Sequence, residues 1–182
     1  MKRAEKWGTM DTSGRKWSEV EQSGMEKWQT TLKEGDPMLT GEFNHSIDSK
    51  GRLIIPSKLR ESLGEHFVIT KGMDGCLFLY PDNEWKAFEE KLRTLPLTNK
   101  KARDFKRFFL GSATEGELDK QGRVLISSSL RAYADLEKEV VLAGVLDKVE
   151  IWSKEAWEAR TADVEENIED IASDMEDLGL SI

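Results

Sequence analysis

A segment of this chain occurs twice. Residues 48–60 read DSKGRLIIPSKLR, and residues 119–131, 71 positions later, read DKQGRVLISSSLR. The similarity resumes further along, where KGMDGCLFLYPDNEW at 71–85 matches AGVLDKVEIWSKEAW at 143–157. A repeat of about 70 residues is too long for one unit of a stacked-repeat protein. The chain therefore contains two copies of one small domain, and a site found in one copy is expected in the other.

The first half of each copy predicts a strand, a tight turn, a second strand and a short helix. In the first copy Asp48 leads into the turn, where Gly51 supplies a positive φ without steric cost. The apolar, β-branched run at 52–55 predicts a buried strand. Pro56 suits the first turn of a helix that ends near Gly64.

The second half of each copy predicts a hairpin and a further helix. Residues 67–71 and 76–80 are apolar runs on either side of a glycine-rich turn. Trp85, Phe88 and Leu92 then follow at helical spacing. A unit this small buries little surface by itself, so we expect the two copies to pack on each other around one core.

These motifs bring a known family into view. The two Asp-x-x-Gly-Arg turns, each followed by an Ile-x-Ser-x-Leu-Arg helix start, closely resemble the MraZ family of bacterial transcription regulators. That family belongs to the AbrB/SpoVT-like swapped-hairpin DNA-binding superfamily. The resemblance runs from Met38, through MLTGEF, to about residue 180, and the 37 residues before Met38 lie outside it.

The resemblance implies an α+β fold. Two tandem copies of a small swapped-hairpin, AbrB-like unit of β-barrel type, with flanking helices, would form a pseudo-symmetric dimer within one chain. The expected division has five parts: an extension that we expect to be disordered at 1–37, the first repeat at 38–98, a basic connecting helix at 99–111, the second repeat at 112–160, and an acidic amphipathic C-terminal helix at 161–182.

The overall charge of −8 is unevenly distributed along the chain. Residues 155–182 contain ten acidic residues and one arginine, whereas residues 38–154 sum to +1. The acidic C-terminal segment thus masks a nearly neutral core, and the net charge does not exclude a nucleic-acid partner. DNA binding would then depend on a few well-aimed contacts in each chain.

The remaining composition suggests a cytoplasmic protein. One cysteine allows no internal disulfide. No apolar run approaches the roughly 18 residues that span a bilayer, and no signal peptide begins the chain. We expect a cytoplasmic, nucleoid-associated location, with no membrane partner, small-molecule substrate, metal or other cofactor.

The repeated turn offers chemistry for DNA recognition. A guanidinium that points outward from such a turn can fork onto the O6 and N7 atoms of guanine in the major groove. A neighbouring lysine can reach phosphates, and an aspartate can brace the turn or orient the arginine. The alternative is that aspartate and arginine merely pair with each other across the hairpin. The candidate DNA-binding residues are Arg52, Arg123, Lys50, Lys120, Asp48 and Asp119.

The segment NKKARDFKRFF at 99–109 interleaves basic and aromatic residues. It fits a connecting helix with a solvated basic face and an aromatic core stripe. That interpretation is favoured over direct DNA contact, although the charge would help to attract DNA.

The C-terminal segment places Val164, Ile168, Ile171, Met175 and Leu178 at helical spacing. Such a stripe packs either on its own domain or on a neighbouring subunit. The family resemblance implies closed rings of subunits, but the sequence does not choose between the two alternatives.

Catalytic interpretations have little support. His45 near Asp48 resembles a general-base pair, but the second copy has no histidine at that position. Ser127–Ser129 have no repeated histidine partner, and no metal-ligand spacing is present.

Residues 1–37 have an unusual relation to DNA sequence. Lys-Trp occurs at 6–7, 16–17 and 27–28, and codon choice allows AAGTGG or AAATGG there. With suitable codons, five copies of AAGTGG share one register of ten nucleotides across all three reading frames, at the codons for residues 6–7, 12–14, 16–17, 19–21 and 22–24. The pair at 27–28 is out of register. A direct repeat of about ten base pairs presents the same groove face once per helical turn. This suggests that residues 1–37 are operator DNA read through from an upstream start codon, and that Met38 is the native start.

The sequence therefore predicts a transcription regulator that binds tandem G-rich direct repeats of double-stranded DNA upstream of its own division and cell-wall operon. It also predicts a homo-oligomer, in ring form. An oligomeric scaffold or interaction protein and an antitoxin-like module on the same fold are the alternatives.

Overall fold

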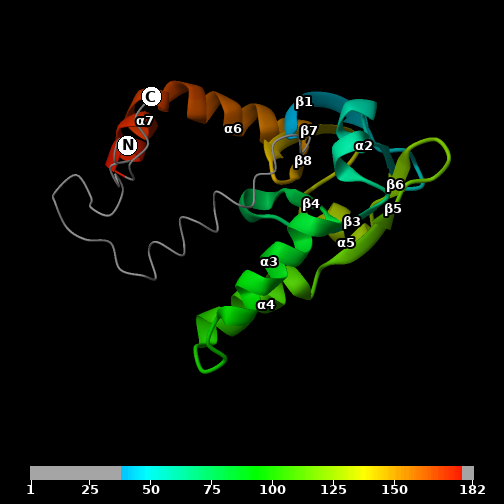
Figure 1. Cartoon of the computed structure of the whole chain (residues 1–182). Coiled ribbons are helices and arrows are strands. Elements are labelled where there is room, and N and C mark those ends of the chain that lie inside the picture. Colours follow the sequence, from blue (N-terminus) through cyan, green and yellow to red (C-terminus); the bar gives the residue numbers. More distant parts are fainter. Residues whose placement is uncertain (1–37, 178–182) are drawn as a thin grey trace, which may run out of the picture. The chain divides into compact units, whose positions relative to one another are not determined.

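The computed structural model describes residues 38–177, which form a mixed α+β fold (Figure 1). The first repeat begins with two strands and a short helix and continues with a hairpin and a longer helix. Its elements are β1 (Leu39–Ser46), β2 (Arg52–Ile54), α2 (Ser57–Leu63), β3 (His66–Lys71), the 3-10 turn η1 (Met73–Gly75), β4 (Leu77–Pro81) and α3 (Asp82–Thr94).

The second repeat has the same order of elements. Helix α4 (Lys100–Leu110) connects the two repeats. The elements that follow are β5 (Thr114–Glu117), β6 (Arg123–Leu125), α5 (Ser128–Tyr133), β7 (Glu139–Leu146), β8 (Val149–Ser153), α6 (Lys154–Glu166) and α7 (Ile168–Asp177).

Strands from the two repeats alternate in space. A six-stranded sheet has the order β1-β7-β8-β4-β3-β5, and a separate ribbon pairs β2 with β6. The first strand of each repeat is antiparallel to a hairpin strand of the other repeat, β1 to β7 and β5 to β3. If each strand is replaced by its equivalent in the other repeat, the same strand order results, read from the opposite edge of the sheet. The sheet is therefore pseudo-symmetric, and neither repeat forms it alone.

The described residues do not form a closed barrel, which corrects the barrel-type expectation. Strands β1 and β5 are the two edges of the large sheet and do not pair with each other. Only three residues long, β2 and β6 pair with one another, and the bridge between Ile47 and Leu53 joins this ribbon to the end of β1. The short strands therefore cap the sheet instead of closing it.

One hydrophobic core joins both repeats beneath the ribbon. Ile55 and Ile126 are fully buried, as are the equivalent helix residues Leu59 and Leu130. A second, aromatic cluster lies on the other face of the central strands. In β4, Leu77 and Leu79 belong to the first core and Phe78 and Tyr80 to the second, as alternation along a strand buried on both faces requires. The aromatic cluster includes Phe78, Tyr80, Trp85, Phe109 and Trp152.

The C-terminal segment differs from the single helix expected at 161–182. Helix α6 begins earlier, at Lys154, and ends at Glu166, and α7 starts after Asn167. The amide nitrogen of Asn167 still donates to the carbonyls of Asp163 and Val164, so the chain turns tightly there. Ile168 remains 52% exposed and Ile171 36%. Leu178, the last residue of the expected stripe, lies outside the described residues, as does the whole segment 1–37.

Candidate nucleic-acid interface

The two repeated turns have the same backbone geometry. In the first, Gly51 donates its N–H to the carbonyl of Asp48 at 2.9 Å, and Gly122 donates to Asp119 at 2.8 Å in the second. The φ angles of these glycines are +81° and +72°, and residues that carry a side chain rarely adopt such angles. Gly51 has the positive φ that the sequence predicted.

Each aspartate braces its turn and holds its arginine. One carboxylate oxygen of Asp48 accepts the backbone N–H groups of Lys50 at 2.9 Å and Arg52 at 3.0 Å. The other accepts from the guanidinium of Arg52, with Nε at 2.7 Å and Nη2 at 2.6 Å. Asp119 makes the same four contacts in its own turn, and its guanidinium distances are 2.8 and 2.7 Å.

These contacts keep both carboxylates charged. The hydrogen bond from the Arg52 side chain is the largest cause that lowers the pKa of Asp48 from 3.8 to about 2. Arg123 has the same effect on the pKa of Asp119. Both carboxylates therefore stay charged to a lower pH than an ordinary aspartate.

The pairing leaves part of each guanidinium available. A guanidinium carries five N–H donors in a planar fork, and the aspartate occupies the edge formed by Nε and Nη2. Within residues 38–177, no hydrogen bond or ion pair engages Nη1 of Arg52 or Arg123. The ion pair with aspartate and an outward-facing guanidinium edge, expected as alternatives, thus coexist in one arrangement.

The ribbon carries both arginines on one outward face. Arg52 lies opposite Leu125 and Arg123 lies opposite Ile54, while Leu53 and Val124 point into the core. Ile54 is 45% exposed, so the expectation that the whole run 52–55 is buried was wrong at this position. Strand alternation explains the difference, because the neighbours of an inward residue must point outward.

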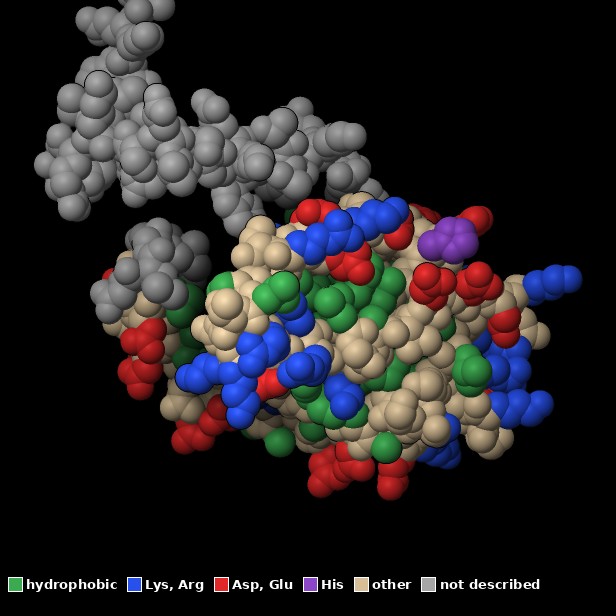
Figure 2. Space-filling view, turned by 90° about the horizontal axis from the view of Figure 1, so that it is seen from below, with side chains coloured by type: hydrophobic (Ala, Val, Ile, Leu, Met, Phe, Trp, Pro, Cys, Tyr) green, Lys and Arg blue, Asp and Glu red, His purple; other side chains and the backbone are tan. Residues whose placement is uncertain are grey.

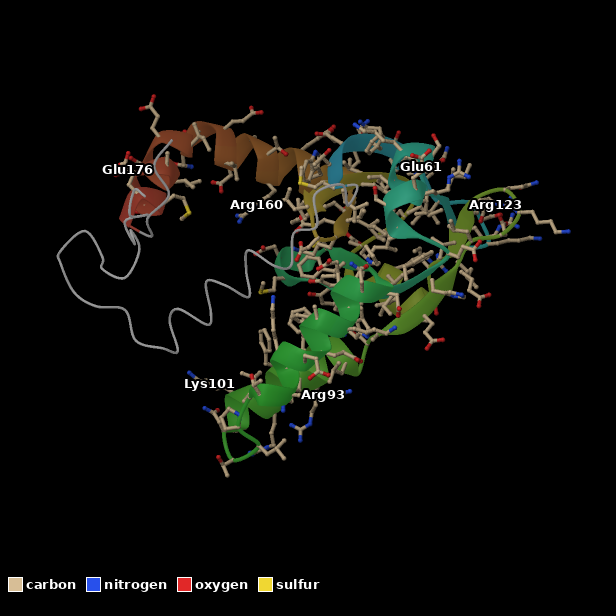
Figure 3. All side chains as sticks on the ribbon, viewed as in Figure 1. Glu61, Arg93, Lys101, Arg123, Arg160 and Glu176 are labelled. Carbon is tan, nitrogen blue, oxygen red and sulfur yellow. The ribbon has the colours of Figure 1, made fainter. Side chains whose placement is uncertain are left out.

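Lys50 and Lys120 are exposed at the tips of the two turns. No salt bridge engages either lysine in the described part of the chain. Figure 3 labels Arg123 at this end of the fold, and Figure 2 shows basic side chains gathered at the same end. The structure therefore brings all six candidate residues to one ribbon and its two turns.

A further pair of arginines, which the repeated motif did not predict as site residues, lies against these turns. A Cβ atom at Gly51 would lie 2.9 Å from Nε of Arg131, and one at Gly122 would clash with Nη1 of Arg60. Each repeat's helix thus places an arginine against the turn of the other repeat. Arg131 Nε donates to the carbonyl of Ile126 at 3.2 Å, whereas Nε of Arg60 is buried without a partner in the described structure. The sequence did contain a sign of this role, because Arg60 and Arg131 occupy the same position in the two copies of the motif.

The basic segment of α4 lies elsewhere. Arg103 and Lys106 donate to the carbonyls of Leu97 and Leu95, in the loop that follows α3. Figures 1 and 3 place the tip of the α3–α4 hairpin, with Arg93 and Lys101, far from the turn that carries Arg123. Phe109 is buried as the connecting-helix interpretation expects, although Phe105 stays 43% exposed.

Residues 38–177 contain no assembled catalytic or metal-binding site. His45, on β1, lies opposite Val140 of β7, and no contact between His45 and Asp48 occurs in the described residues. No cluster of three potential metal ligands occurs in that part of the chain. Burial is the main cause that raises the pKa of the Cys76 thiol to about 12, so this cysteine is a poor nucleophile. Of the helices in this range, none has the length and apolar composition to cross a bilayer.

Comparison with known proteins identifies the family. The family model described as "MraZ protein, putative antitoxin-like" matches twice, at residues 38–108 and 109–178. A protein named transcriptional regulator MraZ from Lachnoclostridium phytofermentans is 55% identical over 144 residues, which cover 79% of this chain and 99% of that protein. Proteins of the same name from Caldanaerobacter subterraneus and a Thermoanaerobacter species are 56% and 55% identical, over 79% of this chain and all of theirs. The family is thus one of transcriptional regulators and not of enzymes, and this chain, with its two tandem copies of the motif, belongs to the MraZ family.

Proposed function

We propose that this protein is a sequence-specific DNA-binding regulator of transcription that binds tandem G-rich direct repeats upstream of its own division and cell-wall operon. The observation that carries the proposal is the ribbon of β2 and β6, which holds Arg52 and Arg123 outward, each oriented by an aspartate. The names of its relatives support regulation of transcription.

The ribbon suits the major groove in size. That groove is about 12 Å wide and accepts a two-stranded β-ribbon. Arg52 and Arg123 are diagonal neighbours in the register, and such positions are about 7–8 Å apart. Base pairs rise about 3.4 Å along each strand, so the two arginines span roughly two base-pair steps. One chain therefore reads one short G-rich element, with Nη1 and the outer hydrogen of Nη2 directed to guanine O6 and N7.

The lysines complete the contact. Lys50 and Lys120 extend from the two ends of the ribbon and reach phosphates on either side of the groove. Asp48 and Asp119 do not read bases in this scheme. They fix the arginine rotamers before binding, which reduces the ordering cost on association.

Direct repeats also imply a mode of assembly. Copies on successive repeats are related head to tail, which is the heterologous contact that closes into rings. Ile168 and Ile171, exposed on α7, are apolar side chains available to such a contact. The pairing of each first strand with the other repeat's hairpin supports placement in the swapped-hairpin superfamily. A complex on the chromosome would be cytoplasmic and nucleoid-associated.

Substitution of the arginines tests the proposal. Arg52→Ala or Arg123→Ala is expected to weaken binding to repeat DNA by about 1–3 kcal/mol and to relax discrimination at one guanine position. Arg52→Lys should not restore it, because an ammonium lacks the fork. Arg93→Ala is the matched control, since it removes the same charge from the exposed surface of α3. Fluorescence anisotropy at fixed salt measures the affinities. Unchanged affinity in the double variant would contradict the assignment.

The same measurement, repeated at a series of rising salt concentrations, separates the alternatives. An oligomeric scaffold or an antitoxin-like module would use the arginine turns for protein contacts. Its association with repeat DNA would then show no sequence preference over scrambled DNA, whereas a specific regulator retains that preference as salt rises.

A further inference from the structure

The outward face of the ribbon exposes two large apolar side chains between its arginines. Ile54 is 45% exposed and Leu125 is 64% exposed. They occupy equivalent positions in the two repeats, and each lies directly opposite the arginine of the other strand. The face therefore presents two mixed pairs, Arg52 with Leu125 and Arg123 with Ile54.

The fold does not need these two side chains to be apolar. The inward residues Leu53 and Val124 already anchor the ribbon, and Ile55 and Ile126 beyond them are fully buried. Single exposed apolar residues are ordinary on protein surfaces. An apolar residue repeated beside each candidate base-reading arginine, on a face framed by cations, indicates a partner that offers both polar and apolar contacts.

Double-stranded DNA offers that combination in its major groove. Guanine presents the acceptors O6 and N7, and thymine presents its C5-methyl group, which apolar side chains contact. Residues directly opposite in a ribbon have Cβ atoms about 4.5–5.5 Å apart, which is about one and a half base-pair steps of roughly 3.4 Å. When an arginine reaches guanine, the apolar side chain across from it lies over the neighbouring base.

We propose that Ile54 and Leu125 are specificity-determining residues that contact thymine methyl groups, Leu125 beside the guanine read by Arg52 and Ile54 beside the guanine read by Arg123. This inference rests on the proposed function, because it requires the ribbon to enter the major groove. These contacts add a preference for thymine next to guanine within each repeat, which the arginines alone do not provide.

Replacement of thymine by deoxyuridine tests the proposal without any change in the protein. The probe is a duplex with four AAGTGG repeats at a spacing of about ten base pairs. In one version, the thymine that precedes GG is deoxyuridine in every repeat, which removes the methyl group and keeps base pairing. A matched control places the same number of deoxyuridines in the spacers. We expect the first version to bind about fourfold more weakly for each methyl that the protein covers, the factor for one buried methylene-sized group, and the control to bind normally.

Protein variants locate the effect. Ile54→Ser and Leu125→Ser remove the apolar surface completely, including every methyl group that could contact thymine. The double variant should bind the thymine and deoxyuridine repeats equally, at the level that the unaltered protein shows for deoxyuridine. Leu97→Ser is the control, because Leu97 is 71% exposed in the loop between α3 and α4. It should retain the preference for thymine, and the thermal midpoint of each variant reports whether it is folded.

The outcomes separate this inference from the proposed function. Equal binding of thymine and deoxyuridine repeats by the unaltered protein overturns the inference and leaves the regulator assignment standing. Retained discrimination in the double variant also overturns it. A change of oligomeric state in the double variant, with discrimination intact, would assign the two side chains to a contact between copies of this chain. Failure of the unaltered protein to prefer the repeats over scrambled DNA overturns both proposals.

Discussion

Two glycine-to-alanine substitutions, at Gly51 and at Gly75, impose the same backbone strain and can therefore be compared directly. Gly51 has φ +81° and Gly75, in the turn between β3 and β4, has φ +83°. Alanine at either position adopts a left-handed conformation, which costs about 1–2 kcal/mol. A Cβ at Gly75 has nothing within 4 Å, whereas a Cβ at Gly51 lies 2.9 Å from Nε of Arg131. The two variants therefore differ in one contact.

That contact sets the expected difference in stability. To accommodate alanine in place of Gly51, Arg131 must move away from the turn and lose its 3.2 Å hydrogen bond to the carbonyl of Ile126. A hydrogen bond of this kind contributes about 1 kcal/mol net. We expect Gly75→Ala to lower the free energy of unfolding by about 1–2 kcal/mol and Gly51→Ala by about 2–3 kcal/mol. Urea unfolding at one fixed protein concentration measures both, so that any self-association is the same for the two variants.

DNA binding should separate the variants further. Once Arg131 has moved away, the turn loses its support and Arg52, the residue after Gly51, is held less firmly. We expect a loss of roughly tenfold in affinity for repeat DNA, within the range for one guanine contact. Gly75→Ala should bind normally despite its lower stability. Equal DNA affinities for the two variants would refute the reasoning that Arg131 supports a DNA-reading turn. Equal unfolding free energies would refute the predicted contact.

Three further outcomes are expected. Because the pKa of Asp48 is lowered to about 2, its contribution to stability is complete above the ordinary value of 3.8 and is lost as pH falls toward 2. The difference in unfolding free energy between the protein and Asp48→Asn should accordingly be constant from pH 5 to 8 and shrink only in that acid range, and a difference that changes near neutrality would contradict this. Affinity for four repeats in series should greatly exceed that for one, and a change of spacing from about ten to about fifteen base pairs should abolish the gain, because the next site then faces the opposite side. A chain that starts at Met38 should bind repeat DNA as tightly as the full chain, and the genomic codons for residues 1–37 should contain AAGTGG-like repeats in the ten-base register; loss of binding on truncation would assign the extension a role as protein.

Local features of this protein could be predicted from the sequence because their causes act within a few residues. Gly51 marks a turn because its backbone must have a positive φ, and its φ in the structure is +81°. Gly64 ends α2 at the expected place, and the glycine-rich turn separates β3 from β4. Duplication of the Asp-x-x-Gly-Arg motif located both candidate turns, and the structure gives them matching hydrogen bonds. The DNA-binding roles of their residues remain predictions.

The tertiary structure decided which surfaces meet. Local patterns do not state that β1 pairs with β7, since about 100 residues separate their partners in the chain. The same long-range packing exposes Ile54 within an apolar run and brings Arg60 to the turn of the other repeat. It also separates the basic face of α4 from the arginine turns. Periodicity and turn chemistry therefore determined the elements of this protein. Contacts between residues distant in sequence determined their pairing, and with it the face on which the two arginines stand.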